Sequence, residues 1–334
     1  MPHHRLLRAR RRSIDRRLFF FLPLLSLVVA AACGGGGTGE GKTSVVAAGD
    51  IAGCFWRGDE ATARLLDGIG GTVLALGDNV YQRGTPDQYT DCYGPTWGRH
   101  LERTRAVMGN HDYRTDHGAP YYAYFGERAG PAGKGWYSFE QEGWHVVALN
   151  SEVPMGEGSE QLAWLRADLA AHPVRCTLAL MHRPRFSTGD HGDSERVKTA
   201  FRALYEAGVD VVLSGHDHNY ERFAPQDPEG RADPRGVRQF VVGTGGAPAY
   251  PMRHARETTE ARTNRARGVL RLVFHDDGYE WDFVPIRGVS YSDRGRAECS
   301  PPVPNPRFTV GAAETPAGLR REAAEDAKEE REEE

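Results

Sequence analysis

The 334-residue chain has few lysines, no apolar run of membrane-spanning length and no excess of positive charge beyond its N-terminus. Its longest apolar run, residues 18–32, has 15 residues, fewer than the about 20 that a membrane-spanning helix needs. Residues 1–32 carry seven Arg against Asp15, a net charge of +6, so the remainder carries −10 of the total of −4. An acidic remainder excludes nucleic-acid binding by bulk charge. Only 4 Lys stand against 38 Arg, so an arginine inside a motif is weak evidence for anion binding.

The N-terminus has the pattern of an export signal. A basic head precedes the apolar run, which ends in three alanines before Cys33. This pattern resembles a bacterial lipoprotein signal, which implies removal of residues 1–32 and attachment to a membrane through lipid on Cys33. Because Ala30 stands where leucine is usual, free secretion is the alternative. Residues 16–20, Arg-Arg-Leu-Phe-Phe, also resemble a twin-arginine signal. We therefore predict an extracytoplasmic protein, secreted or anchored as a lipoprotein.

Composition divides the rest of the chain into three parts. Residues 33–43 are rich in glycine and predict a flexible tether. Residues 314–334 carry nine acidic and four basic side chains, too polar a composition to bury a core. We therefore expect a folded domain over residues 44–310 and a charged, disordered tail over residues 311–334.

The folded part alternates short β-rich apolar runs with bursts of polar residues. Eight runs are expected to be strands: 45–48, 73–76, 105–108, 145–149, 177–181, 209–213, 239–242 and 269–274. Near-continuous apolar strands are typical of sheets buried on both faces. Leucines at helical spacing follow Ser159, a predicted N-cap, and a second apolar pattern of this kind follows Ser194. These patterns predict an α/β fold with functional residues on the loops after the strands.

Metal-binding residue types follow five of these strands. The bursts are Gly49-Asp50, Gly77-Asp78-Asn79-Val80-Tyr81, Gly109-Asn110-His111-Asp112, His182-Arg183-Pro184, and Gly215-His216-Asp217-His218-Asn219-Tyr220-Glu221-Arg222. Each burst alone is more often a turn than a site. Together they supply oxygen and imidazole ligands that suit two transition-metal ions.

The order of these bursts resembles that of the calcineurin-like metallophosphoesterases, and most closely that of purple acid phosphatase-like bacterial phosphatases. The resemblance covers residues 44–285 and is carried by the motifs GDxxY, GNHD and GHxHxYER. It implies a four-layer αββα sandwich of two mixed β-sheets flanked by helices, with a dinuclear metal site at the C-terminal ends of the strands. The domain over residues 44–310 would then be the catalytic domain.

The resemblance also implies the metal ligands. One ion would be held by Asp50, Asp78, Tyr81 and His218, and Asp78 would bridge to a second ion held by Asn110, His182 and His216. Many relatives have Asp-x-His in the first motif, where this chain has Ala52. Tyr81 supplies a phenol in exchange, which favours Fe(III) at the first position and Zn, Mn or Fe(II) at the second. A purely packing role for Tyr81 is the alternative.

Three further residues are candidates for catalysis. His111 resembles the phosphate-contacting histidine of the family, and Asp112 is placed to orient its imidazole. His191 is the second candidate, as a general acid or substrate-binding residue, with an ordinary surface-loop histidine as the alternative. Arg183 and Arg185 are weaker candidates for binding substrate oxygens. The rest of the last motif is interpreted as support for the histidine pair: Asp217, Tyr220, Glu221 and Arg222.

The resemblance therefore predicts an exported, acid phosphatase-like hydrolase that acts on small phosphomonoesters by attack of a metal-activated hydroxide. Phosphodiesters, nucleotides or pyrophosphates are alternative substrates, and a non-catalytic extracytoplasmic binding lipoprotein is an alternative function. The oligomeric state is left open.

Cysteine usage fits an oxidising compartment. If Cys33 is lipidated, the four remaining cysteines form an even set with three pairings. Cys54 follows Asp50 by 4 residues and Cys92 follows Tyr81 by 11, which places both at one rim of the fold. We favour the pairs Cys54–Cys92 and Cys176–Cys299.

Overall fold

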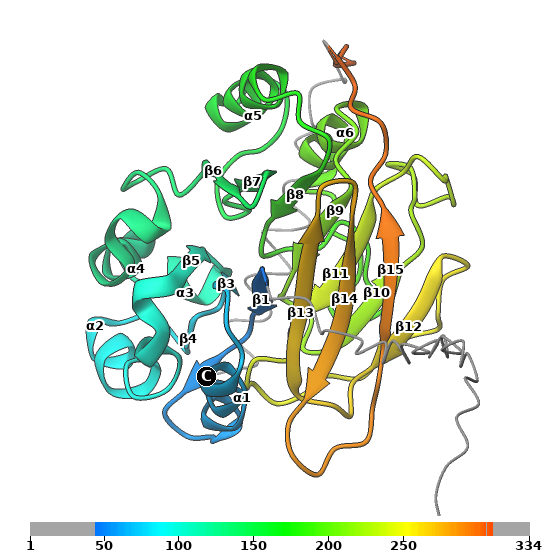
Figure 1. Ribbon diagram of the computed structural model, residues 1–334. Helices are drawn as coiled ribbons and strands as arrows, with labels where there is room; N and C mark the ends of the chain where they lie inside the picture. The colour runs from blue at the N-terminus through cyan, green and yellow to red at the C-terminus, as the bar shows by residue number, and fades with distance from the viewer. Residues whose placement is uncertain (1–43, 305, 310–334) are drawn as a thin grey trace, which may run out of the picture. The chain divides into compact units, whose positions relative to one another are not determined.

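The computed structural model describes residues 44–304 and 306–309 (Figure 1). The predicted signal, tether and tail lie outside the described residues, and so do residues 305 and 310 of the predicted domain. Within the described part of the chain, no helix combines the length and apolarity needed to cross a bilayer.

The first sheet contains the strands that carry the first three polar bursts. Its six strands lie in the order β15-β14-β13-β1-β3-β5. Their bounds are β1 Val45–Ala48, β3 Thr72–Leu76, β5 Thr104–Val107, β13 Gly268–His275, β14 Gly278–Pro285 and β15 Arg294–Glu298. Strands β1, β3 and β5 are parallel, whereas β13 pairs antiparallel with β1. The C-terminal ends of the three parallel strands therefore share one edge, and a short pair, β2 Ala52–Gly53 and β4 Val80–Tyr81, extends from them.

The second sheet carries the two remaining bursts. Its seven strands lie in the order β12-β10-β11-β9-β8-β7-β6. Their bounds are β6 Tyr137–Gln141, β7 Trp144–Ala148, β8 Thr177–Leu180, β9 Val211–Ser214, β10 Tyr220–Phe223, β11 Arg238–Val242 and β12 Thr259–Thr263. The central strands β7, β8, β9 and β11 are parallel, and the outer strands are antiparallel to their neighbours. Both sheets are mixed, as predicted.

Alternation of side chains along the second sheet divides the core into two parts. Val211 and Leu213 of β9 join a cluster with side chains of the first sheet, whereas Val212 between them joins a cluster with two helices. Successive side chains of a strand point to opposite faces, so the second sheet lies between the first sheet and those helices. These two helices are α5, Glu160–Ala171, and α6, Lys198–Glu206.

Short helices pack against the first sheet. Helix α1, Gly58–Gly68, contacts β13, and the 3₁₀ segments η2, Trp97–Arg103, and η4, Gly126–Ala129, contact β3 and β5. The remaining helical segments are α2 Pro86–Gln88, η1 Tyr89–Tyr93, α3 Asn110–Tyr113, η3 Asp116–Gly118 and α4 Ala119–Phe125. The predicted α/β sandwich of two mixed sheets with helices is confirmed.

The local predictions fare differently at α5 and α6. Ser159 caps α5, because its hydroxyl oxygen accepts a hydrogen bond from the backbone N–H of Leu162 at 3.2 Å. The helix predicted after Ser194 is present but starts four residues after that serine: α6 begins at Lys198, and Val197 occupies the N-cap without a side-chain hydrogen bond. All eight expected strands are present within about two residues of their predicted ends.

Both predicted disulfides are present. Cys54 is bonded to Cys92, and Cys176 to Cys299, with Cα–Cα distances of 5.1 and 5.5 Å. The first disulfide ties the loop after β2 to η1, beside the polar edge of the first sheet.

Candidate metal centre

The polar bursts lie on strained turns that follow the strands directly. Asp50, Asp78 and His216 have φ angles of 59°, 48° and 73°, a left-handed conformation that costs energy in residues with a Cβ atom. Gly77, at φ 85°, precedes Asp78, and a Cβ atom there would lie 2.5 Å from Nδ1 of His182. Only glycine lets these two bursts approach each other so closely.

Tyr81 is the meeting point of the first group of predicted ligands. Its hydroxyl oxygen lies 3.0 Å from Oδ1 of Asp50, 3.0 Å from Oδ2 of Asp78 and 2.9 Å from Nε2 of His218. The other ring nitrogen of His218, Nδ1, donates to the carbonyl of Pro248 at 2.6 Å, so Nε2 points its lone pair at this group. All four side chains are buried.

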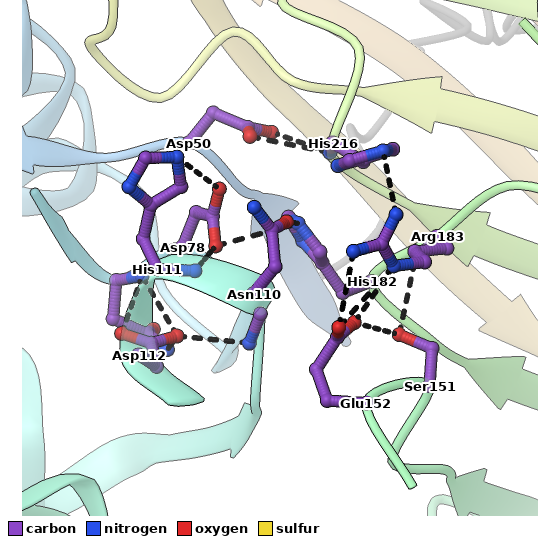
Figure 2. Close-up of polar contacts among 12 residues, drawn as sticks. Asp50, Asp78, Asn110, His111, Asp112, Ser151, Glu152, His182, Arg183 and His216 are labelled. Atoms are coloured by element: carbon purple, nitrogen blue, oxygen red, sulfur yellow. Dashed lines mark hydrogen bonds and ion pairs between the residues drawn. The ribbon is translucent and has the colours of Figure 1, made fainter. Parts of the chain in front are cut away.

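The carboxylate of Asp78 faces both groups of predicted ligands. Its Oδ2 faces Tyr81, and its Oδ1 lies 3.4 Å from Nε2 of His182. That nitrogen also lies 3.1 Å from Oδ1 of Asn110, and Nδ1 of His182 donates to the carbonyl of Leu76 at 2.9 Å. Figure 2 shows Asp78 between His111, Asn110 and His182. A hydrogen bond from Nδ1 of this kind leaves Nε2 of His182 as the atom that could bind a metal.

His216 closes the second group of ligands. Its backbone N–H donates to both oxygens of Asp50, at 3.2 and 2.9 Å, which binds the last burst to the first (Figure 2). Its ring lies 5.1 Å from that of His182, centroid to centroid. The Nδ1 atom of His216 is buried without a hydrogen-bond partner. Since buried polar atoms are normally satisfied, this orphaned nitrogen fits a metal ligand.

The charges of the centre favour binding of cations. Burial, and then the charges of Asp50 and Asp78, raise the pKa of the Tyr81 phenol well above its ordinary value. Burial opposes ionisation of Asp78, but the positive charges of the neighbouring His182 and His111 outweigh it and lower the pKa of its carboxyl. Burial likewise opposes protonation of His182, but the charge of Asp78 outweighs it and raises the pKa of His182 to about 10, so a bound metal ion would take the place of a proton there. Burial also lowers the pKa of His216, which is therefore neutral, the form that binds metals. Carboxylate, phenol, amide and neutral imidazole form a donor set that fits two metal ions.

The comparisons with known proteins agree with this geometry. The model of the calcineurin-like phosphoesterase family matches residues 43–220. The chain belongs to the calcineurin-like phosphoesterases. A relative, purple acid phosphatase 21 of Arabidopsis thaliana, is 31% identical over an alignment of 262 residues, and the match covers 68% of this chain and 56% of the relative. Acid phosphatase A of Cryphonectria parasitica is 34% identical over an alignment of 139 residues, and the match covers 33% of this chain and 28% of the relative.

A solved structure shows the same fold. Purple acid phosphatase PPD1 from yellow lupin (Lupinus luteus) seeds superposes with a TM-score of 0.60 and 18% identity, covering 76% of this chain and 53% of that one. The chain thus spans about half the length of the relatives it matches. These relatives come from plants and a fungus, whereas the sequence resemblance pointed to bacterial phosphatases. Membership of the calcineurin-like phosphoesterases implies a dinuclear metal centre.

His111 lies beside Asp78 in the cluster of predicted ligands, but Asp112 has other contacts than expected. The backbone N–H of His111 donates to Oδ1 of Asp78 at 2.9 Å, and its Nδ1 donates to the carbonyl of Gln82 at 2.7 Å. Gln82 therefore supplies the orienting acceptor that we expected from Asp112. The carboxylate of Asp112 instead receives the hydroxyl of Tyr89 at 2.6 Å and the backbone N–H groups of Gly109 and Asn79. It fixes the turns that carry the ligands, and burial followed by the charge of Asp78 raises its pKa to about 6.

His191 lies against the centre through ring stacking. Its ring stacks on that of His216, with centroids 4.2 Å apart. The backbone N–H groups of His191 and Gly192 donate to the carboxylate of Asp217 at 3.0 and 3.3 Å. Asp217 thus supports the loop of His191, whereas we expected it to support the histidine pair.

The other residues of the last burst also hold outer parts of the molecule. Glu221 accepts hydrogen bonds from Thr188, and both Tyr220 and Arg222 donate to Asp293. These three side chains were predicted to support the histidine pair. They instead anchor β10 and the loop before His191.

Sequence reasoning missed one buried ion pair beside the predicted ligands. Glu152 accepts hydrogen bonds from Nε and a terminal nitrogen of Arg183, each at 3.2 Å (Figure 2). Arg183 also lies 3.3 Å from Nε2 of His216. The signal was present, because Asn150-Ser151-Glu152 is a polar burst after an expected strand. It contains neither glycine nor histidine, whereas each of the other bursts contains at least one of the two.

Proposed function

We propose that the chain is an extracytoplasmic phosphatase that hydrolyses phosphomonoesters at a pair of metal ions. The observation that carries this proposal is the position of Asp78, whose two oxygens face different ligand groups, Tyr81 on one side and His182 on the other. A carboxylate in that position suits a bridge between two cations. The two disulfides support an oxidising, extracytoplasmic location.

Each ion would have its own set of side chains. The first set is Asp50, Asp78, Tyr81 and His218, and the second is Asp78, Asn110, His182 and His216. When bound, the two ions neutralise charge on the phosphoryl group and make hydroxide available near neutral pH. The phenol of Tyr81 favours Fe(III) in the first set, whereas the amide and imidazoles of the second suit Zn, Mn or Fe(II).

Two histidines flank the proposed phosphate position. The Gln82 carbonyl holds Nδ1 of His111, so its Nε2 is the atom that faces Asp78, at 3.8 Å from Oδ2. His191 lies on the other side, stacked on His216. We assign His111 to phosphate binding and His191 to the leaving-group side, where an imidazolium donates a proton to the departing oxygen.

Hydrolysis assays test the proposed reaction. The purified chain, loaded with iron and zinc, is expected to hydrolyse 4-nitrophenyl phosphate faster than bis(4-nitrophenyl) phosphate. Asp78→Asn is expected to lower kcat/KM for the monoester by at least about a thousandfold, because both ions lose a ligand. Arg294→Gln, on the surface strand β15, serves as the control and should retain activity. A preference for the diester would change the substrate class, and undiminished activity in Asp78→Asn would refute the proposed centre.

The visible absorption spectrum tests the first ion. A phenolate bound to Fe(III) gives a charge-transfer band, so the iron-loaded chain is expected to be coloured and Tyr81→Phe colourless. A band that persists in Tyr81→Phe, or a fully active, colourless enzyme that contains only zinc or manganese, would contradict the assignment of iron to this position.

A further inference from the structure

A cavity lies next to the proposed metal centre, and of its lining only His191 has a role in the mechanism above. It has a volume of about 430 Å³ and is lined by two segments, residues 187–193 and residues 253–256. Its lining is polar and includes His191, Arg253 and Arg256. A cavity of this size accommodates a small organic group.

The cavity shares a wall with the metal centre. His191 lines the cavity and stacks on His216, one of the proposed ligands. Tyr250 contacts the ring of His191 at 5.3 Å and stacks on His218, another proposed ligand, at 3.9 Å. The ring of His191 would therefore lie between the cavity and a phosphoryl group at the metal centre, on the side where we place the leaving group.

The walls of the cavity are fixed by hydrogen bonds. The backbone N–H of Arg253 donates to the carbonyl of Thr188 at 2.6 Å, which ties the two segments together. Thr188 is held in turn by the carboxylate of Glu221 at 2.9 and 2.8 Å. The backbone N–H of Ser187 donates to Asp193 at 3.0 Å. The cavity is thus a preorganised part of the fold, which lowers the cost of binding a ligand there.

One of the two arginines in the cavity has an uncompensated charge. Arg256 forms an ion pair of 2.7 Å with Asp193. The guanidinium of Arg253 donates to the backbone carbonyl of Asp190, and within residues 44–304 and 306–309 no carboxylate pairs with it. The cavity therefore presents a net positive charge and free guanidinium N–H groups, which bind carboxylates and phosphates well.

We propose that this cavity binds the leaving group of the substrate and selects phosphomonoesters whose leaving group carries a second anionic group, through Arg253. This inference rests on the proposed phosphatase function and adds to it a class of substrate. A carboxylate and a phosphate both satisfy the guanidinium, so the second anion is defined by its charge and its oxygen atoms.

Phosphonates that cannot be hydrolysed test this inference by binding alone. Calorimetry with the metal-loaded protein compares propylphosphonate with 3-phosphonopropionate and with propane-1,3-bisphosphonate, which add a carboxylate or a second phosphonate. Each of the two ligands with an anionic tail is expected to bind about fivefold more tightly than propylphosphonate. Arg253→Gln should abolish that preference without weakening propylphosphonate, and Arg294→Gln should preserve it.

The outcomes separate this inference from the proposed function. Equal affinity for all three phosphonates, or a preference that survives in Arg253→Gln, overturns the role of the cavity and leaves the phosphatase proposal intact. Failure of every phosphonate to bind overturns both. If only one of the two tailed ligands is preferred, that ligand identifies the second anion as a carboxylate or a phosphate.

Discussion

The buried pair of Glu152 and Arg183 gives the sharpest prediction about stability. Both side chains are less than a tenth exposed, and Arg183 lies beside His216. Burial opposes ionisation of Glu152, but the charge of Arg183 outweighs it and lowers the pKa of the carboxyl, so the pair is ionised at neutral pH. Glu152→Gln keeps the shape and removes the charge, which leaves a guanidinium buried without its counterion. Such a loss costs about 3–5 kcal/mol of the free energy of unfolding.

Removing both charges should restore most of that loss. The double variant Glu152→Gln/Arg183→Met replaces the pair by groups of similar volume and should lie within about 1 kcal/mol of the parent protein. Urea unfolding, followed by fluorescence, measures the free energy of unfolding of the parent protein, of Glu152→Gln, of Arg183→Met and of the double variant. Glu102→Gln, in an exposed ion pair, is the control and should change stability by less than about 0.5 kcal/mol. If Glu152→Gln costs no more than this control, or if the second change gives no recovery, the pair does not form as described.

Two further predictions concern stability. Burial raises the pKa of Asp210 to about 7 from 3.8, so the folded state holds a proton that the unfolded chain loses. Its contribution is full below pH 4 and falls by about 4 kcal/mol as the pH rises to 7, and Asp210→Asn should flatten that part of the pH profile measured by urea unfolding. The disulfides Cys54–Cys92 and Cys176–Cys299 close loops of 38 and 123 residues, so paired serine substitutions should cost about 4 and 5 kcal/mol respectively. Thermal unfolding would contradict this order if loss of the first disulfide were the more damaging.

The sequence predicted the elements of this fold better than their caps. Continuous apolar runs identified β1, β3 and β9 because strands buried on both faces leave no room for polar residues. The start of α6 was misplaced, because Ser194 is a good capping residue and nothing local in the sequence shows that the chain turns only at Val197. Capping preference is local, whereas the position of that turn is set by packing against the second sheet.

The candidate site divides in the same way. Asp50, Asp78 and His216 were predicted from glycine-led bursts after strands, a pattern that records strained turns. The actual contacts of Asp112 were not predictable, since its acceptor role depends on Tyr89 and on backbone groups brought together only in three dimensions. Glu152 escaped notice because a lone acidic residue after a strand has no distinctive pattern.

Anomalous X-ray diffraction from crystals of the metal-loaded chain tests the central claim most directly. We predict two peaks about 3.5–4 Å apart, one against Tyr81 and the other against Asn110, with the carboxylate of Asp78 between them. A single peak that leaves one of these groups without a metal, or peaks elsewhere on the molecule, would contradict a dinuclear centre built from these strand ends.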